Sequence, residues 1–208
     1  MRSASGMAAV EEQTHSAAAP DVKDPDGALV ARIGAGDRAA AAELVNKHAP
    51  RMIRLAYRML NDSHAAEDVA QEVFLRVWKA APDWVPGEAK FQTWMHRVAI
   101  NLCYDRLRKK RETLTETLPE RPDEADGPAD ALQKSQTGAI VQEAVAKLPE
   151  RQRVAITLCH YQELSNIEAA EIMGVSVEAL ESLLARGRRG LRAALEGLKP
   201  DLLGDGHG

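Results

Sequence analysis

The sequence of 208 residues is poor in cysteine and aromatic residues and has no long apolar run. Its two cysteines, Cys103 and Cys159, stand far apart in segments with helical periodicity, which disfavours a disulfide framework and favours two buried, reduced thiols. The chain has no stretch of about 18 apolar residues, which is the length needed to span a bilayer. Residues 1–20 hold no continuous apolar core, so they do not resemble a secretory signal. We therefore expect a cytoplasmic protein with a disordered leader over residues 1–23.

The chain also lacks a net positive charge. Its 27 lysine and arginine residues against 31 acidic residues leave a net charge of -4, which by itself argues against a nucleic-acid partner. The distribution is uneven, however. Residues 86–111 carry seven basic and two acidic residues, a net of +5, whereas residues 112–134 carry seven acidic and two basic residues, a net of -5. The basic segment is therefore a candidate for binding nucleic acid, and an acidic segment follows it directly.

A stretch rich in proline, aspartate and glutamate divides the chain. Residues 112–136 have almost no aliphatic periodicity and are too many for an ordinary tight connection, which is typical of a flexible acidic linker. This linker separates a first domain over residues 24–111 from a second domain over residues 137–198. We expect a loose tail over residues 199–208.

The first domain is predicted to be helical, because no segment alternates with a period of two residues as a strand would. Asp37 can cap a helix that ends at His48, and Pro50 suits the first turn of a helix. Ser63 starts a helix that runs to about Ala80. A further helix over residues 91–110 carries a core-facing stripe of Phe91, Trp94, Met95, Val98 and Leu102.

The second domain is predicted to contain helices over residues 138–148 and 150–161, then a short helix, a glycine and a long final helix. The segment Ser165–Glu168 reads Ser-Asn-Ile-Glu, a capping box in which each side chain satisfies a free backbone amide. Gly174 can adopt the left-handed conformation of a tight turn, and Ser176 caps the last helix. This order predicts a helix-turn-helix, whose second helix enters the major groove of DNA.

The last helix separates its apolar and charged residues when 100° is allowed per residue. Within about 60° of one line lie Val177, Leu180, Leu183, Leu184, Gly187, Leu191, Ala194 and Leu195. The outward face consists of Glu178, Ser182, Ala185, Arg189 and Arg192, with Glu181, Arg186 and Arg188 on its flanks. Such a face could merely solvate a small bundle, but four arginines within residues 186–192, the capping box and the glycine turn favour DNA binding.

Three stretches together resemble the extracytoplasmic-function sigma factors of bacterial RNA polymerase. They are HAAEDVAQEVFLRVWKA (residues 64–80), KFQTWMHRVAINLCYDRLRKKR (residues 90–111) and LPERQRVAITLCHYQELSNIEAAEIMGVSVEALESLLARGRRGLR (residues 148–192). The resemblance covers about 170 of the 208 residues. It implies an all-α protein whose first domain binds core polymerase and recognises and melts the minus-ten promoter element, while the second domain reads the minus-thirty-five element. It also implies no enzymatic activity, no cofactor, and control by an anti-sigma factor in a stress or envelope response.

The helix expected over residues 63–80 supplies the candidate polymerase-binding residues. Its wheel turns outward Asp68, Gln71, Leu75 and Trp78, and inward Ala66, Val69, Ala70, Val73 and Val77. The resemblance implies that Asp68, Gln71 and Glu72 dock on the clamp helices of the polymerase's largest subunit. Leu75 and Trp78 complete this set, or else they pack under the neighbouring N-terminal helices.

The segment DWVPGEAKFQTW, residues 83–94, supplies the candidate melting loop. In the resembled family this loop receives a flipped base, which implies a pocket within residues 84–90. Aromatic and basic side chains suit that task, because opening a duplex requires capture of unstacked bases and neutralised phosphates. The candidates for minus-ten recognition and melting are Trp84, Lys90, Arg97, Asn101, Arg106, Arg108 and Lys109. Phe91, Trp94 and Met95 are expected in the core.

The candidates for minus-thirty-five binding are Ser176, Glu178, Glu181, Ser182, Ala185, Arg186, Arg188, Arg189 and Arg192. The helix dipole explains a carboxylate in the first turn, such as Glu178. Many members of the resembled family carry basic residues at the positions of Glu181 and Leu183, so the chain departs from the pattern there. Base reading is left to Ser182, Arg186 and Glu181, which either accepts from cytosine or repels phosphate.

Three other functions compete with this one. A repressor or response-regulator output domain would share the helix-turn-helix but leaves the first domain unexplained. A metal or redox enzyme built on Cys103, Cys159 and His160 is disfavoured, because adjacent side chains on a helix point about 100° apart and no second ligand pair is present. A scaffold that binds a partner through its helices is the remaining alternative, and a sigma factor held by an inhibitor would resemble it.

Overall fold

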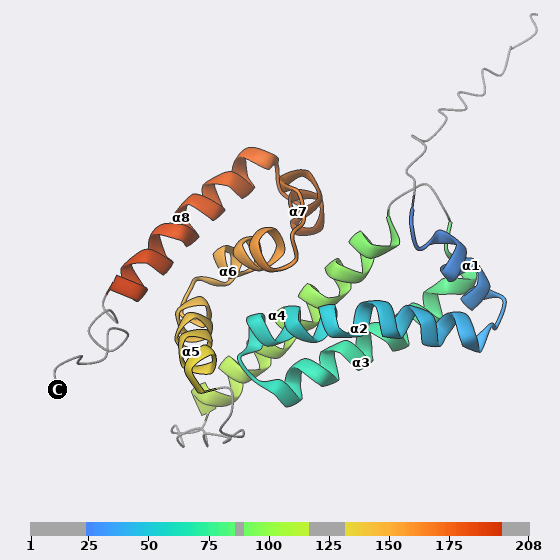
Figure 1. The fold of residues 1–208 in the computed structure, drawn as a ribbon, viewed down its shortest axis with the longest axis horizontal. Coiled ribbons are helices and arrows are strands. Elements are labelled where there is room, and N and C mark those ends of the chain that lie inside the picture. The colour runs from blue at the N-terminus through green and yellow to red at the C-terminus, as the bar shows by residue number, and fades with distance from the viewer. Residues whose placement is uncertain (1–23, 86–89, 117–131, 197–208) are drawn as a thin grey trace, which may run out of the picture.

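The structure is a computed structural model that describes residues 24–85, 90–116 and 132–196. Within these ranges the chain is helical and contains no strand, which confirms the predicted fold class (Figure 1). The expected leader and tail lie outside the described residues. The helices are α1 (Gly27–Gly34), α2 (Arg38–Leu60), α3 (Ser63–Ala80), α4 (Phe91–Glu116), α5 (Leu132–Ala146), α6 (Glu150–Ile156), α7 (Asn166–Met173) and α8 (Val177–Glu196).

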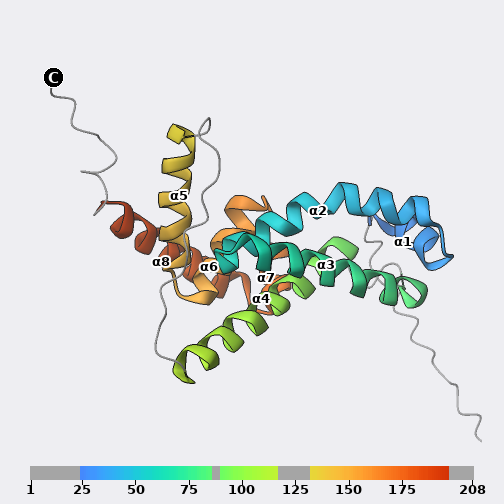
Figure 2. The same cartoon turned by 90° about the horizontal axis from the view of Figure 1, so that it is seen from below.

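Helices α2 and α3 lie side by side and, with α1 and α4, enclose the core of the first domain (Figures 1 and 2). Asp37 begins α2 as predicted, because its carboxylate accepts hydrogen bonds from the amides of residues 39 and 40. Asn61 ends α2 in the left-handed conformation at φ 53°, and Asp62 then caps α3. The predicted stripe of α4 faces this core, with Phe91 and Met95 completely buried and Trp94 partly buried.

One expectation for the first domain is wrong. Pro50 does not lie in the first turn of a second helix; α2 continues through it from Arg38 to Leu60. A proline inside a helix removes the hydrogen bond to the carbonyl four residues earlier, here that of Asn46. Both Asn46 and Pro50 are exposed, so solvent can satisfy this carbonyl. The residues that follow, Met52 and Leu55, are completely buried, and their packing holds the helix together.

The helices beside the acidic segment are longer than expected. Helix α4 ends at Glu116 rather than near Lys110, and α5 begins at Leu132 rather than at Gly138. Residues 111–116 contain neither glycine nor proline, so nothing in the local sequence ends α4 at Lys110. The described residues do not include 117–131.

The second domain follows the predicted order with one local change. The helix expected over residues 150–161 is α-helical only to Ile156, and Thr157–Tyr161 form a π-helical turn. The capping box of Ser165 and Glu168 is present, with both of its hydrogen bonds. Gly174 adopts the left-handed conformation at φ 62°, as the predicted tight turn requires. The local sequence therefore encodes the helix-turn-helix of α7 and α8.

The two domains touch along one side of α2 and at the start of α4. Helix α2 contacts α5, α6 and the π-helical turn, and α4 contacts α7. The contact is polar: Arg51 donates to the side chain and carbonyl of Gln162, and Arg153 donates to the carbonyl of Met59 at 2.5 Å. The guanidinium of Arg58 lies 4.1 Å from the centre of the Tyr161 ring. These contacts place α7 over the candidate melting residues.

Candidate nucleic-acid interfaces

Helix α8 presents its arginines to solvent and its leucines to the domain core. Leu180 and Leu184 are buried, whereas Arg186, Arg188 and Arg189 are exposed, as the wheel predicts. The candidate minus-thirty-five residues of α8 are all exposed, as is Ser176, whose hydroxyl accepts from the amide of residue 179 and caps the helix. The face is accessible to a duplex, and its arginines suit phosphate contacts.

Two glycines allow α8 to approach its neighbours closely. A Cβ atom at Gly187 would lie 2.9 Å from Cγ1 of Ile156, and one at Gly190 would lie 2.9 Å from Cδ2 of Leu148. These distances are too short for an unstrained contact. The arginine-rich end of α8 is therefore held against the domain by backbone proximity, which keeps the exposed face in a fixed direction.

Glu181 has a contact within the protein that the wheel could not show. Its Oε1 accepts a hydrogen bond of 3.4 Å from the side-chain amide of Asn166, the first residue of α7. The bond is long and exposed, so its contribution to stability is small. It nevertheless links the two helices of the helix-turn-helix, and this gives the acid a role that requires no base contact.

An aromatic group surrounds the start of α4. The rings of Trp84 and Phe91 meet edge to face with centroids 4.9 Å apart, and Trp94 lies 5.8 Å from Trp84. A cavity of about 250 Å³ opens beside Trp84 and Trp94 and is also lined by Arg97 and by Glu171 of α7. The indole nitrogen of Trp84 is buried and has no hydrogen-bond partner among the described residues. Residues 86–89 of the predicted pocket lie outside the described residues.

Two of the candidate melting residues have their side chains paired with groups of the second domain. The ammonium of Lys90 forms an ion pair of 2.8 Å with Glu168, and Arg97 donates to the backbone carbonyl of Glu171 at 2.7 Å. The hydrogen bond from Lys90, followed by that from Ser165, lowers the pKa of Glu168 to about 2. The same ion pair raises the pKa of Lys90 above its usual value. Asn101 is exposed.

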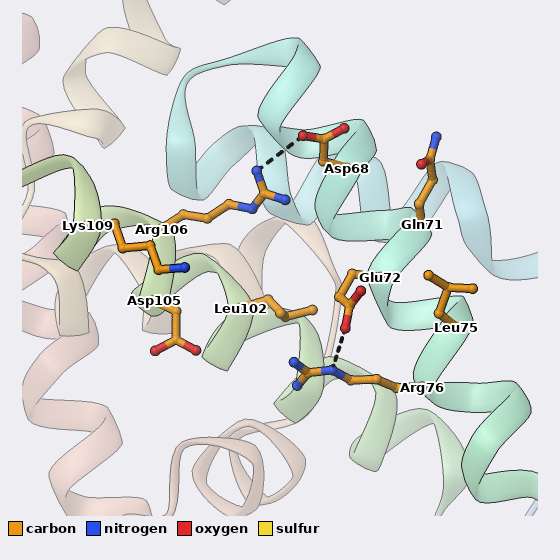
Figure 3. Close-up of a pocket in the computed structure, with 9 residues that line it drawn as sticks. All are labelled: Asp68, Gln71, Glu72, Leu75, Arg76, Leu102, Asp105, Arg106 and Lys109. Carbon is orange, nitrogen blue, oxygen red and sulfur yellow. Dashed lines mark hydrogen bonds and ion pairs between the residues drawn. The ribbon is translucent and has the colours of Figure 1, made fainter.

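The structure separates the remaining melting candidates from this aromatic group. Arg106 donates to Asp68 of α3 at 3.3 Å, and Arg108 pairs with Asp105 on its own helix. Arg106 and Lys109 line a cleft of about 570 Å³ with residues of α3 (Figure 3). Arg106 and Lys109 thus lie beside α3, whereas Lys90 and Arg97 lie against α7, which the linear order of basic residues did not reveal.

This cleft contains most of the candidate polymerase-binding residues. Asp68, Gln71, Glu72 and Leu75 lie along it on α3, and Glu72 is paired with Arg76 at 3.0 Å (Figure 3). Leu75, which lines the cleft, is 53% exposed, and Trp78 of the same helix is 40% exposed. Neither side chain is therefore a fully buried core residue. The centroid of the Trp78 ring lies 5.9 Å from that of Phe74, which is buried.

Buried polar side chains that were not predicted from the sequence lie near the contact between the domains. His96 is completely buried on α4, and its Nδ1 lies 2.7 Å from the carbonyl oxygen of Gln92. Burial lowers the pKa of His96 to about 4. Gln142 and Arg153 are also buried and reach the carbonyl oxygens of Tyr57 and Met59. No local pattern marks Gln142 and Arg153, because these two carbonyl oxygens belong to the other domain.

The thiols and possible metal ligands support neither competing enzyme site. Cys103 is buried, and burial raises its pKa to about 12, whereas Cys159 is only half-buried, contrary to expectation. A thiol with so high a pKa carries little thiolate and is a poor nucleophile. Within residues 24–85, 90–116 and 132–196, no group of three possible metal ligands occurs. In the same part of the chain no helix is long and apolar enough to cross a membrane.

In comparisons with known proteins, each domain matches a region of the Sigma-70 proteins. Residues 44–113 match the Sigma-70 region 2 family, and residues 139–191 match the Sigma-70 region 4 family. The ECF RNA polymerase sigma factor SigE of Mycolicibacterium smegmatis is 37% identical over 193 residues, which cover 89% of this chain and 74% of the relative. SigW of Bacillus subtilis, also an ECF RNA polymerase sigma factor, is 36% identical over 81% of this chain and 96% of its own.

Solved structures of similar fold are complexes with a second protein. The structure of CnrH in complex with the cytosolic domain of CnrY matches with a TM-score of 0.63 and 26% identity, covering 84% of this chain and 99% of that one. The fold also matches that of the sigma factor RpoE, solved with the anti-sigma factor NepR from Bartonella quintana, with a TM-score of 0.62 and 22% identity. The second match covers 74% of this chain and 96% of that one.

Proposed function

Because the chain belongs to the extracytoplasmic-function sigma factors of bacterial RNA polymerase, we propose that its two domains divide the recognition of one promoter. The exposed face of α8 contacts the minus-thirty-five element, and the start of α4 contacts the minus-ten element. The observation that carries this proposal is the separation on α8 of buried leucines from exposed arginines, in a helix-turn-helix that the family match includes. The polymerase performs the nucleotide chemistry, so this chain needs no cofactor and acts in the cytoplasm.

In this proposal Arg188, Arg189 and Arg192 of α8 contact phosphates, whereas Ser182 and Arg186 read bases. Arg188 and Arg189 are exposed on the flank and centre of the outward face, where they can follow a DNA backbone. We assign Glu181 to the contact with Asn166 of α7, whose side-chain amide donates to its Oε1 at 3.4 Å, and not to a base. The preferred promoter is therefore set by few side chains on this helix.

The outer face of α3 binds core polymerase in this proposal. Leu75 and Trp78 provide exposed apolar surface, and the carboxylates of Asp68 and Glu72 provide charge around it. An apolar centre with a polar surround is the usual composition of a protein interface. Arg106 belongs to this face through its ion pair with Asp68, so we assign it to the polymerase contact and not to melting.

A protein inhibitor completes the proposed function. CnrH was solved with the cytosolic domain of CnrY, and a sigma factor of similar fold was solved with an anti-sigma factor. By analogy, an anti-sigma factor silences this chain until a stress or envelope signal releases it. The exposed apolar residues of α3 are suitable for such a partner, because an inhibitor that covers them also excludes polymerase.

The decisive experiment adds the purified protein to bacterial core RNA polymerase with a genomic promoter library and maps the transcript starts. We expect a set of starts that depends on the added protein. If no start depends on it and the protein alone binds duplex DNA as a dimer, a repressor replaces the sigma factor in this proposal.

A second experiment tests the phosphate contacts of α8. Replacement of Arg188 and Arg189 by alanine removes two proposed phosphate contacts. The slope of log affinity for promoter DNA against log salt concentration should then fall by about 2 in magnitude. The matched control replaces Arg38 and Arg54, two exposed arginines of α2, and should leave the slope as it was. An unchanged slope in the α8 variant would show that these arginines only solvate the surface.

A further inference from the structure

The contact between α7 and α4 places acidic groups on the proposed minus-ten surface. Glu168 neutralises Lys90 at 2.8 Å, and the backbone of Glu171 takes one hydrogen bond from Arg97. The carboxylate of Glu171 also acts on Lys90 through its charge. Both basic residues are therefore engaged by the second domain of the same chain, in positions where the proposed function requires DNA phosphates.

The same contact restricts the cavity beside the aromatic group. Glu171 forms part of the wall of the cavity that Trp84 and Trp94 line. An unstacked base that enters this cavity would bring its phosphate close to Glu171, and like charges repel at short distance. The cavity is consequently unfavourable for a nucleotide as long as α7 remains in place.

A second set of contacts holds α7 in this position. The π-helical turn of residues 157–161 is followed by Glu163 in the left-handed conformation at φ 55°, an uncommon conformation for a residue with a side chain. This irregular backbone brings Gln162 into the first domain, where it is 1% exposed and accepts hydrogen bonds from Arg51. A strained turn that delivers a buried polar contact to the other domain is evidence of a specific arrangement.

We propose that α7 is an internal lock, in which Glu168 and Glu171 occupy the minus-ten surface of the free protein in place of DNA. This inference rests on the proposed function, because it takes Lys90 and Arg97 as DNA contacts. The lock is weak, because the ion pair between Lys90 and Glu168 is partly exposed and such pairs contribute little free energy in water. Core polymerase opens it by separating the domains, so the free protein does not occupy promoters alone.

The test uses the full chain with Glu168→Gln and Glu171→Gln together. Glutamine also serves at the third position of a capping box, so α7 keeps its start while both charges are lost. The matched control, Glu143→Gln with Glu196→Gln, removes two charges from exposed positions of the second domain. Small-angle scattering measures the radius of gyration, and fluorescence anisotropy measures affinity for labelled single-stranded oligothymidine without polymerase.

The lock predicts a larger radius of gyration and about 3- to 10-fold tighter oligothymidine binding for the double variant than for the control. An oligothymidine affinity of the Glu168→Gln, Glu171→Gln variant equal to that of the original chain would overturn it, whether or not the domains separate. Equal tightening in this variant and in the control would also overturn it, since that result reports general charge alone.

A further arm separates failure of the lock from failure of the proposed function. Arg97→Ala is added to the Glu168→Gln, Glu171→Gln variant. If the lock and the function are both correct, this change reverses the tightening at least in part. If the double variant binds more tightly but Arg97→Ala has no effect, then α7 covers a different DNA surface and both the assignment of Arg97 and this form of the lock are wrong. Starts that still depend on the protein with core polymerase would leave the sigma function intact in either case.

Discussion

The buried His96 should make this protein lose stability in mild acid. Its side chain is completely buried on α4, and the groups that face it are Gln92 of its own helix, Arg51 and His48 of α2, and Gln162 of the second domain. Burial lowers its pKa from 6.5 to about 4, and the charge of Arg51 acts in the same direction. The folded protein therefore keeps this imidazole neutral where the unfolded chain binds a proton.

The size of the loss follows from the two pKa values. Between pH 6.5 and about 4 the unfolded state binds more protons than the folded state, so the free energy of unfolding falls as the pH falls. From roughly pH 7.5 to roughly pH 5 the contribution of His96 is a loss of about 2 kcal/mol. The stability is fully present above the unfolded pKa, and the loss is complete below about pH 4.

Urea unfolding at both pH values, followed by circular dichroism, measures this effect. His96→Asn retains a donor near the carbonyl of Gln92 but cannot take up a proton. The change in its free energy of unfolding between the two pH values should therefore be about 2 kcal/mol smaller than that of the original chain. His64→Asn is the matched control at an exposed position. Parallel pH profiles for the original chain and His96→Asn would refute the argument, whatever their difference at neutral pH.

Three further predictions concern stability in the same urea titration. Gly34→Ala should lower the free energy of unfolding by about 1–3 kcal/mol, because its Cβ would lie 2.7 Å from the carbonyl oxygen of Ala81. Asp37→Ala removes the acceptor of two amides and should cost about 0.5–2 kcal/mol. Arg153→Met leaves three carbonyl oxygens without this donor and should cost about 1–3 kcal/mol.

Each of these predictions has an outcome that contradicts it. A stable Gly34→Ala variant would mean that α1 can move away from the turn after α3. An Asp37→Ala variant with unchanged stability would show that water replaces the cap without cost. If Arg153→Met were as stable as the original chain, the domain contact would not depend on this guanidinium.

The polymerase contact is open to a separate test by pull-down with core polymerase. Leu75→Ala and Trp78→Ala should weaken that binding by about 30-fold or more if they are central to the interface. Tyr57→Ala changes a side chain of similar exposure on α2 and should bind as the original chain does. Equal losses for all three variants would indicate unfolding rather than a lost contact, which circular dichroism would reveal.

Local features of the fold were predictable from the sequence because their causes are local. The Ser165 and Glu168 side chains cap a helix with their own neighbouring amides, and Gly174 adopts the conformation that the turn requires. The face of α8 follows from 3.6 residues per turn and the positions of its leucines and arginines. By contrast, proline at position 50 signals a helix start only when packing does not override it.

The assignment of basic residues to surfaces was not predictable, because it depends on which helix lies opposite each side of α4. Arg106 meets Asp68 on α3, whereas Lys90 meets Glu168 on α7, although both basic residues belong to the same segment of the sequence. The sequence by itself determined the helices, their caps and the polar face of α8, since these follow from periodicity and short-range hydrogen bonds. Only the tertiary structure decided which charges face DNA, which face α3 and which are covered by the second domain, because a charge is neutralised by what lies beside it in space.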